Sequence, residues 1–270
     1  ADKHRPLIGK LVILFQPAEE TGAGAELVIK DSKFKEIAPD LAFGFHNLPG
    51  YQENTCFIKF GTFSSASTGV IIRLKGLSSH AAYPEDGNNP DKCLAELINE
   101  FNSINTQNSF DDFVLITVIH AKLGEVAFGT TPGEATIMLT IRSYQNNDMD
   151  KLIQNIKSTL VRVCKKHKIN HQIDFTEYFP ANSSDEYCVN LVKESAKTCN
   201  IDTIKLENAF RWSEDFGHFA INFKSGFFGI GSGRNHPQLH NENYDFPDQI
   251  IPTGIKIFFE IYKNLLLKNG

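Results

Sequence analysis

Short apolar runs alternate with amphipathic segments in the first part of the chain. Lys10–Phe15 and Leu41–Phe45 are apolar runs rich in branched and aromatic residues, a pattern typical of buried strands. Ala25–Ile29 lies between them, opens on small residues and is predicted to be a helix. A strand, a helix and a second strand in this order indicate a mostly parallel sheet with helical crossovers.

The middle of the chain has a different pattern, in which apolar residues at helical spacing separate strand-like runs. Six elements are predicted there, in the order β-α-β-β-α-β: Val70–Leu74, Asp91–Ile104, Phe113–Ile119, Ala135–Ile141, Asp150–Lys166 and His171–Phe175. This order is that of the ferredoxin-like split motif. We therefore interpret residues 67–176 as an inserted domain.

The last part of the chain returns to the pattern of the first. Asp185–Thr198 and Gly254–Leu267 are predicted helices, and Ser225–Ile230 is a predicted buried strand. Ser213, followed by Glu214 and Asp215, has the composition of a helix N-cap.

The simplest architecture is an α/β fold with a discontinuous larger domain. Residues 1–66 and 177–270 would form its two parts, and residues 67–176 would interrupt it. A chain of 270 residues is long enough for two domains of this kind.

Composition limits the partners that the chain can have. The net charge of −5 argues against nucleic acid, since a phosphate backbone requires a basic surface. No apolar run of the length of a membrane span occurs, so no membrane partner is expected. The cysteines are odd in number and form no C-x-x-C pair, which indicates reduced thiols and a cytoplasmic protein.

Acidic and imidazole side chains follow the predicted strands. Glu19 and Glu20 come after the first apolar run, His46 follows the second, and His240 follows the loop after Ser225–Ile230. Ligands of open α/β sheets bind outside the carboxyl ends of strands. Carboxylates and imidazoles suit a divalent metal, and adjacent side chains of an extended backbone point in opposite directions. One glutamate could therefore bind a metal while its neighbour accepts a proton from an attacking water.

Each of these residues also has an ordinary structural interpretation. Paired acids at a helix start stabilise the helix dipole, and this holds for Glu19 with Glu20 as well as for Glu214 with Asp215. A histidine after a strand is often a hydrogen-bonded structural residue. The stretch "GIGSG" lacks the spacing of a dinucleotide-binding loop. The pattern alone leaves these alternatives open.

Five stretches, in order along the chain, carry a family resemblance: "GKLVILFQPAEETGAGAELVI", "FGFHNLPG", "LKGLSSHAAYPEDGNNP", "RWSEDFGHF" and "FFGIGSG…HPQLHNENYDFPDQIIPTG". Together they resemble the metal-dependent amidohydrolases of the aminoacylase/carboxypeptidase family, in the branch of hippurate hydrolase and the indole-acetyl-amino-acid hydrolases. The resemblance implies a zinc-peptidase-like, mostly parallel α/β domain interrupted by a ferredoxin-like lid through which the protein forms a homodimer.

The resemblance also implies roles for single residues. Glu19 matches the family's general base, and Glu20, His46 and His240 match metal ligands. His80, in "SSHAA", matches a lid histidine that helps to hold the substrate or the developing oxyanion, although a strand-end cap is its ordinary alternative.

Glu214 and Arg142 are the further candidates for contacts with substrate. The implied cofactor is a divalent metal, two ions per intact site, with zinc, manganese, cobalt and nickel as candidates. The implied reaction is hydrolysis of the amide bond of an N-acyl amino acid or small peptide.

The chain departs from the family pattern at its start. The family supplies two more ligands from a "C-G-H-D-x-H" motif about thirty residues before "FQPAEE", by the resemblance, whereas only 14 residues precede that stretch here. We therefore expect a family member that lacks its N-terminal portion. The alternative to a hydrolase is a catalytically incompetent fragment that folds and dimerises through the lid.

Overall fold

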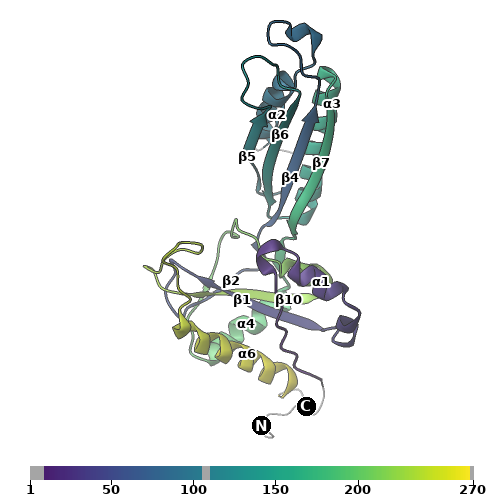
Figure 1. Cartoon of the computed structure of the whole chain (residues 1–270). Helices are drawn as coiled ribbons and strands as arrows, with labels where there is room; N and C mark the ends of the chain where they lie inside the picture. Colours follow the sequence, from purple (N-terminus) through teal and green to yellow (C-terminus); the bar gives the residue numbers. More distant parts are fainter. Residues whose placement is uncertain (1–8, 105–109, 268–270) are drawn as a thin grey trace. The chain divides into compact units, whose positions relative to one another are not determined.

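The computed structural model describes residues 9–104 and 110–267, which fall into two compact units (Figure 1). The larger unit contains the residues up to Ser64, together with Asn182–Phe210 and the residues from Glu214 onward. The smaller unit contains Ser65–Ala181 and Arg211–Ser213. The domain ranges expected from sequence stay a prediction.

The smaller unit is an antiparallel sheet with two helices on one face (Figure 1). The sheet order is β5-β6-β4-β7. The elements are β4 (Ala66–Lys75), α2 (Asp91–Ile104), β5 (Val114–Leu123), β6 (Glu134–Ser143), α3 (Asn146–His167) and β7 (Asn170–Phe179). Their chain order and strand order are those of the ferredoxin-like motif. The mixed α/β fold class is therefore confirmed.

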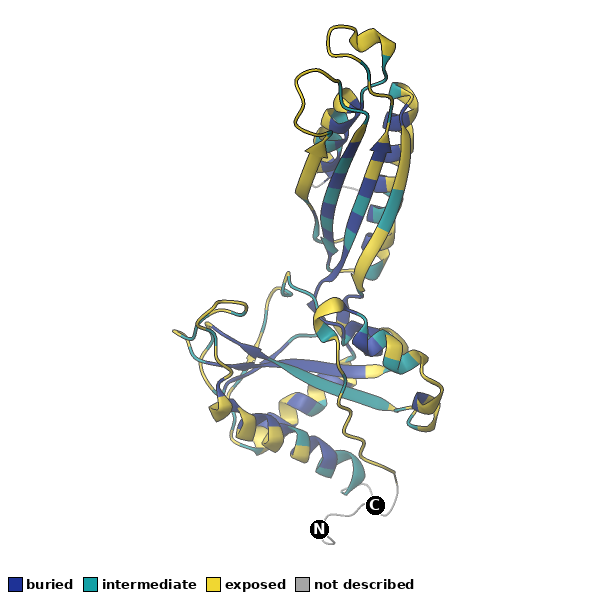
Figure 2. Cartoon of the chain, viewed as in Figure 1, coloured by how far each residue is buried: buried dark blue, intermediate teal, exposed yellow. Residues whose placement is uncertain are grey.

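The core of the smaller unit follows from helical and strand periodicity. Leu97 and Phe101 of α2 and Leu152 and Ile156 of α3 are fully buried against alternate residues of the strands. Colouring by burial shows the same alternation along the central strands (Figure 2). The amphipathic helices of the middle block were thus readable from the sequence.

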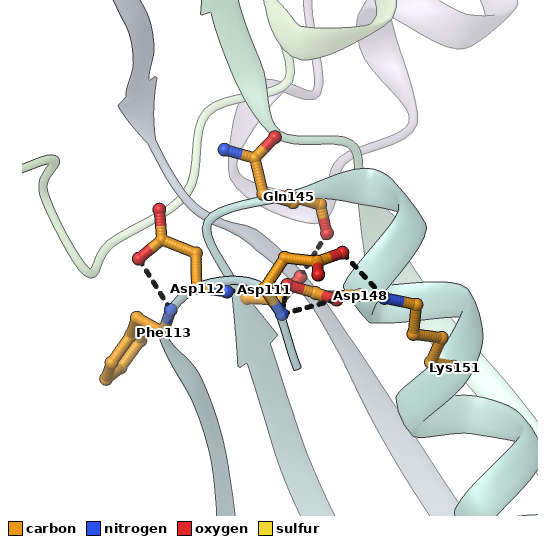
Figure 3. Close-up of polar contacts among 7 residues, drawn as sticks. Asp111, Asp112, Phe113, Gln145, Asp148 and Lys151 are labelled. Atoms are coloured by element: carbon orange, nitrogen blue, oxygen red, sulfur yellow. Dashed lines mark hydrogen bonds and ion pairs between the residues drawn. The ribbon is translucent and has the colours of Figure 1, made fainter. Parts of the chain in front are cut away.

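A buried carboxylate fixes the start of β5 to α3 (Figure 3). Asp148 is fully buried and accepts hydrogen bonds from the backbone N–H groups of Asp111 and Asp112 and from the Lys151 ammonium. Burial alone would raise its pKa, but these donors hold the pKa of Asp148 below its usual value. We call these four residues the Asp148 cluster.

The larger unit is built on a mixed four-stranded sheet of order β1-β10-β2-β9. The β1–β10 and β2–β9 pairs are parallel, and β10–β2 is antiparallel. The strands are β1 (Leu41–Leu48), β2 (Cys56–Ile58), β9 (Thr203–Lys205) and β10 (Lys224–Gly231), with a second ladder between β3 (Gly61–Ser64) and β8 (Asn182–Ser184).

Helices cover both faces of this sheet (Figure 1). Phe227 and Phe228 of β10 point to opposite faces, since Phe227 packs against Phe216 and Phe228 against Phe258. The helices are α1 (Gly24–Lys30), α4 (Glu186–Thr198), α5 (Gly217–Asn222) and α6 (Ile251–Leu266), and the short 3₁₀ turns are η2 (Glu19–Thr21), η3 (Ser32–Glu36), η4 (Pro84–Asp86) and η5 (Asp248–Ile250). None of the helices in the described ranges combines the length and apolar composition needed to cross a bilayer.

Two expectations were wrong. Residues 10–15 form no strand, and their side chains are exposed, up to 89 % for Phe15. An apolar run becomes a strand only where a neighbour supplies ladder hydrogen bonds, and no described strand pairs with this segment. Ser213 caps no helix, because α5 begins at Gly217 and has no side-chain cap.

Candidate active site

Three carboxylates of the larger unit gather at one point. Glu19, Glu214 and Asp215 each place a carboxylate oxygen within 4.8 Å of the other two. Glu214 and Asp215 are only 7 % and 3 % exposed. We call this group the acid cluster. Among the described residues it is the single group of three or more acidic, histidine or cysteine side chains close enough to hold a metal ion.

Glu19 is positioned by a tight turn. It opens η2, which lies between Ala18 (φ 62°) and Gly22 (φ 70°), both in the left-handed region. The Gly22 N–H donates to the Glu19 carbonyl at 2.8 Å, and the Thr21 hydroxyl donates to the Ala18 carbonyl at 3.1 Å. A non-glycine residue in this region is strained, and such strain is often found at functional sites. The turn brings the chain from the exposed segment to the acid cluster.

Asp215 is fixed by the start of α1. Its Oδ2 accepts hydrogen bonds from the Ala25 N–H at 2.8 Å and from the Gln16 amide at 2.6 Å. Gly24 makes this approach possible, because a Cβ there would overlap the Pro17 carbonyl and lie 3.0 Å from Asp215 Oδ2. The glycine at position 24 is therefore required by close packing against Pro17 and the acid cluster.

Crowding of like charges shifts the protonation of the acid cluster. Burial, a hydrogen bond with Glu19 and repulsion by the neighbouring carboxylates raise the pKa of Glu214 to about 10. Burial also raises the pKa of Asp215, although its bonds from Ala25 and Gln16 oppose the change. A bound divalent cation would remove this repulsion, and carboxylate oxygens are ligands that such cations accept. The donor set therefore fits a divalent metal.

The segments that carry the two candidate histidine ligands lie in contact. His46 is in β1, and its Nδ1–H donates to the Asn47 carbonyl at 2.7 Å, which leaves the lone pair of the neutral ring on Nε2. The Asn47 amide donates to the Tyr244 hydroxyl at 2.5 Å, in the loop of His240. The His240 side chain is exposed, and its backbone has a left-handed conformation with φ 62°.

The structure thus brings together some of the expected residues. Glu19 and Glu214 are neighbours, and Asp215, which the sequence suggested only as a helix-start acid, joins them. Glu20 is exposed, and neither it nor His46 nor His240 belongs to the acid cluster. The sequence shows Asp215 as a second acid beside Glu214, but no sequence pattern predicts the hydrogen bond that it accepts from the Ala25 N–H.

The other two expected residues lie in the smaller unit. His80 is exposed, and its Nδ1 accepts the Ala82 N–H at 3.1 Å. Arg142, in β6, is partly buried, and its Nη1 donates to the Arg211 carbonyl at 2.7 Å and to the Ser213 hydroxyl at 3.1 Å. Arg142 therefore contacts the segment that precedes the acid cluster in the chain.

The chain is similar in sequence and in fold to several known proteins. Hippurate hydrolase of Campylobacter jejuni is 26 % identical over 259 residues, which are 94 % of this chain and 66 % of that protein. A crystal structure from methicillin-resistant Staphylococcus aureus aligns with a TM-score of 0.83 at 16 % identity, over 93 % of this chain and 65 % of that one. A Bacillus subtilis dinuclear metal-binding peptidase of family M20 aligns with a TM-score of 0.76 at 18 % identity, over 93 % and 64 %.

The chain spans about two thirds of the length of the curated relatives that it matches. The two solved structures share its fold at low identity. The model of peptidase family M20/M25/M40 matches residues 1–264, and the chain belongs to that family.

Proposed function

We propose that this protein hydrolyses the amide bond of N-acyl amino acids or small peptides with a bound divalent metal. The observation that carries the proposal is the acid cluster, in which Glu19 of "QPAEE" lies beside buried Glu214 and Asp215. Family membership and the relative named hippurate hydrolase support an amide substrate. The metal, when bound, would polarise the amide carbonyl and acidify a water molecule.

Glu19 is the general base in this proposal. Glu214 supports the assignment, because it is buried and its hydrogen bond to Glu19 helps to hold the Glu19 carboxylate in place. Glu19 takes a proton from the attacking water and delivers it to the leaving amine. Glu20, His46 and His240 are the proposed ligands, and two ions of zinc, manganese, cobalt or nickel would complete the site.

His80 is proposed as the group that stabilises the developing oxyanion, and Glu214 and Arg142 as contacts with substrate. We also propose a cytoplasmic homodimer that associates through residues 67–176. The exposed edge strand β5 of the smaller unit supports this association, since its outer backbone groups can pair with a second copy.

The second candidate is a protein that folds and dimerises but does not catalyse. The observation in its favour is that Glu20, His46 and His240 lie outside the acid cluster. Three ligands leave a two-metal site incomplete, so the isolated chain would bind metal weakly and show little amidase activity. Robust turnover of N-acetyl or N-benzoyl amino acids by the chain with added manganese would rule this candidate out.

A pair of substitutions tests the hydrolase, made in the longest form of the protein that its gene encodes. Glu19→Gln should keep metal content near normal and lower turnover by about 10²–10⁴-fold, because it removes only the proton acceptor. Glu20→Gln should lower metal content, with activity falling as a consequence. Metal by mass spectrometry and turnover are measured for both. If both variants keep metal and activity, the proposal fails.

A further inference from the structure

One short segment passes from the larger unit to the smaller and back. Arg211–Ser213 belongs to the smaller unit, whereas Phe210 before it and Glu214 after it belong to the larger. We call it the joining segment. Building on the proposed function, we propose that Arg142 is a positioning residue, which fixes the joining segment and through it the carboxylates of Glu214 and Asp215.

The backbone of the joining segment is held at two successive carbonyls. Arg142 Nη1 donates to the Arg211 carbonyl at 2.7 Å, and the Ser65 hydroxyl donates to the same oxygen at 2.5 Å. The Ser65 N–H donates to the Trp212 carbonyl at 3.0 Å. Arg142 Nη1 also reaches the Ser213 hydroxyl at 3.1 Å. Four hydrogen bonds on three residues leave the segment little freedom.

The Arg211 side chain adds a further attachment. Its guanidinium lies over the Phe113 ring at 4.8 Å from the centroid. Phe113 is fixed in turn, because its N–H donates to Asp112 and the Asp148 cluster holds the preceding backbone (Figure 3). The joining segment is therefore attached to the residues that precede β5 in the smaller unit.

The acid cluster begins one peptide bond beyond this anchor. Glu214 and Asp215 are buried, so their carboxylates can adopt few orientations once Ser213 is fixed. Arg142 suits the task, since one charged nitrogen donates to a carbonyl and a hydroxyl at once. An arginine already engaged with the backbone in this way supports the site, in addition to the proposed contact with substrate.

Trp212 offers a direct readout, because it is the only tryptophan of the chain and lies in the middle of the joining segment. Arg142→Gln should shift its fluorescence emission and increase its quenching by acrylamide, and Arg142→Lys should give an intermediate result. Arg162→Gln is the matched control, since Arg162 pairs with Glu100 elsewhere in the smaller unit. Its Trp212 signal should equal that of the wild type.

The second readout is a titration with manganese chloride, followed by calorimetry. Arg142→Gln should bind Mn²⁺ about tenfold more weakly than the wild type, the effect of losing one hydrogen bond from a charged group. Ser213→Ala should change the Trp212 fluorescence and the Mn²⁺ affinity in the same direction by a smaller amount. This variant replaces Arg142→Gln in both measurements if circular dichroism shows that Arg142→Gln does not fold.

The two proposals fail in different ways. Unchanged Trp212 emission and quenching in Arg142→Gln would overturn the positioning role, whatever the activity. A raised KM with unchanged kcat and unchanged Trp212 signal would show a direct substrate contact and would also overturn it. If the wild type binds no Mn²⁺ and cleaves no amide, the proposed function fails, while the Trp212 comparison still decides the role of Arg142.

Discussion

The two units differ in what they bury. The smaller unit buries the apolar positions of α2 and α3 against its sheet, and its buried charge, Asp148, is fully hydrogen-bonded. The larger unit buries the crowded carboxylates of Glu214 and Asp215 and exposes the apolar run 11–15. An apolar pattern therefore predicts a helix or strand correctly only where another segment packs against its apolar side chains. A functional site, in contrast, keeps buried charges that stability alone would not favour.

The largest difference should appear when one apolar residue of each unit is replaced by alanine and the free energies of unfolding are compared. Leu97→Ala, in the core of the smaller unit, should lower the free energy of unfolding by about 2–5 kcal/mol, because Leu97 is fully buried. Ile13→Ala should change it by less than about 0.5 kcal/mol, because Ile13 is 72 % exposed. Chemical denaturation measures both. Equal effects would mean that residues 10–15 are packed in solution.

Gly24→Ala should have the next largest effect, a loss of about 1–3 kcal/mol. The new Cβ would overlap the Pro17 carbonyl and crowd Gln16 and Asp215, so α1 must move away from the acid cluster. Gly129→Ala is the control, because a Cβ there meets no atom within 4 Å. Thermal unfolding of the two variants should differ clearly, and similar melting temperatures would contradict the close packing around Asp215.

The pH dependence of stability should be smaller but specific. The pKa of Glu214 is about 10 in the folded chain against its ordinary 4.5, so the folded state keeps a proton that the unfolded state releases between these values. Without divalent metal, the free energy of unfolding should therefore fall as pH rises through this window. Glu214→Gln should flatten the curve, and exposed Glu207→Gln should not. A wild-type curve that rises with pH would refute the assigned protonation.

The sequence predicted the smaller unit better than the site. The range of α2 matched the expected helix, since Leu94, Leu97 and Phe101 repeat at helical spacing. The strand predicted for residues 10–15 was wrong, because a buried strand and an exposed apolar segment can have the same sequence pattern. Glu19 and Glu214 were picked out by motif, whereas Asp215 and Gly24 act through contacts between segments far apart in the chain, which local patterns do not encode.

The central question is whether the buried acids of the larger unit help it to bind a cation. Calorimetric titration of Mn²⁺ near neutral pH, into the wild type and into Glu214→Gln, tests this most directly. We expect binding to the wild type and an affinity about 10–100-fold lower in the variant, because Glu214 is hydrogen-bonded to Glu19 and so helps to orient the turn that carries the proposed ligand Glu20. Identical titrations, or no binding to either protein, would contradict it.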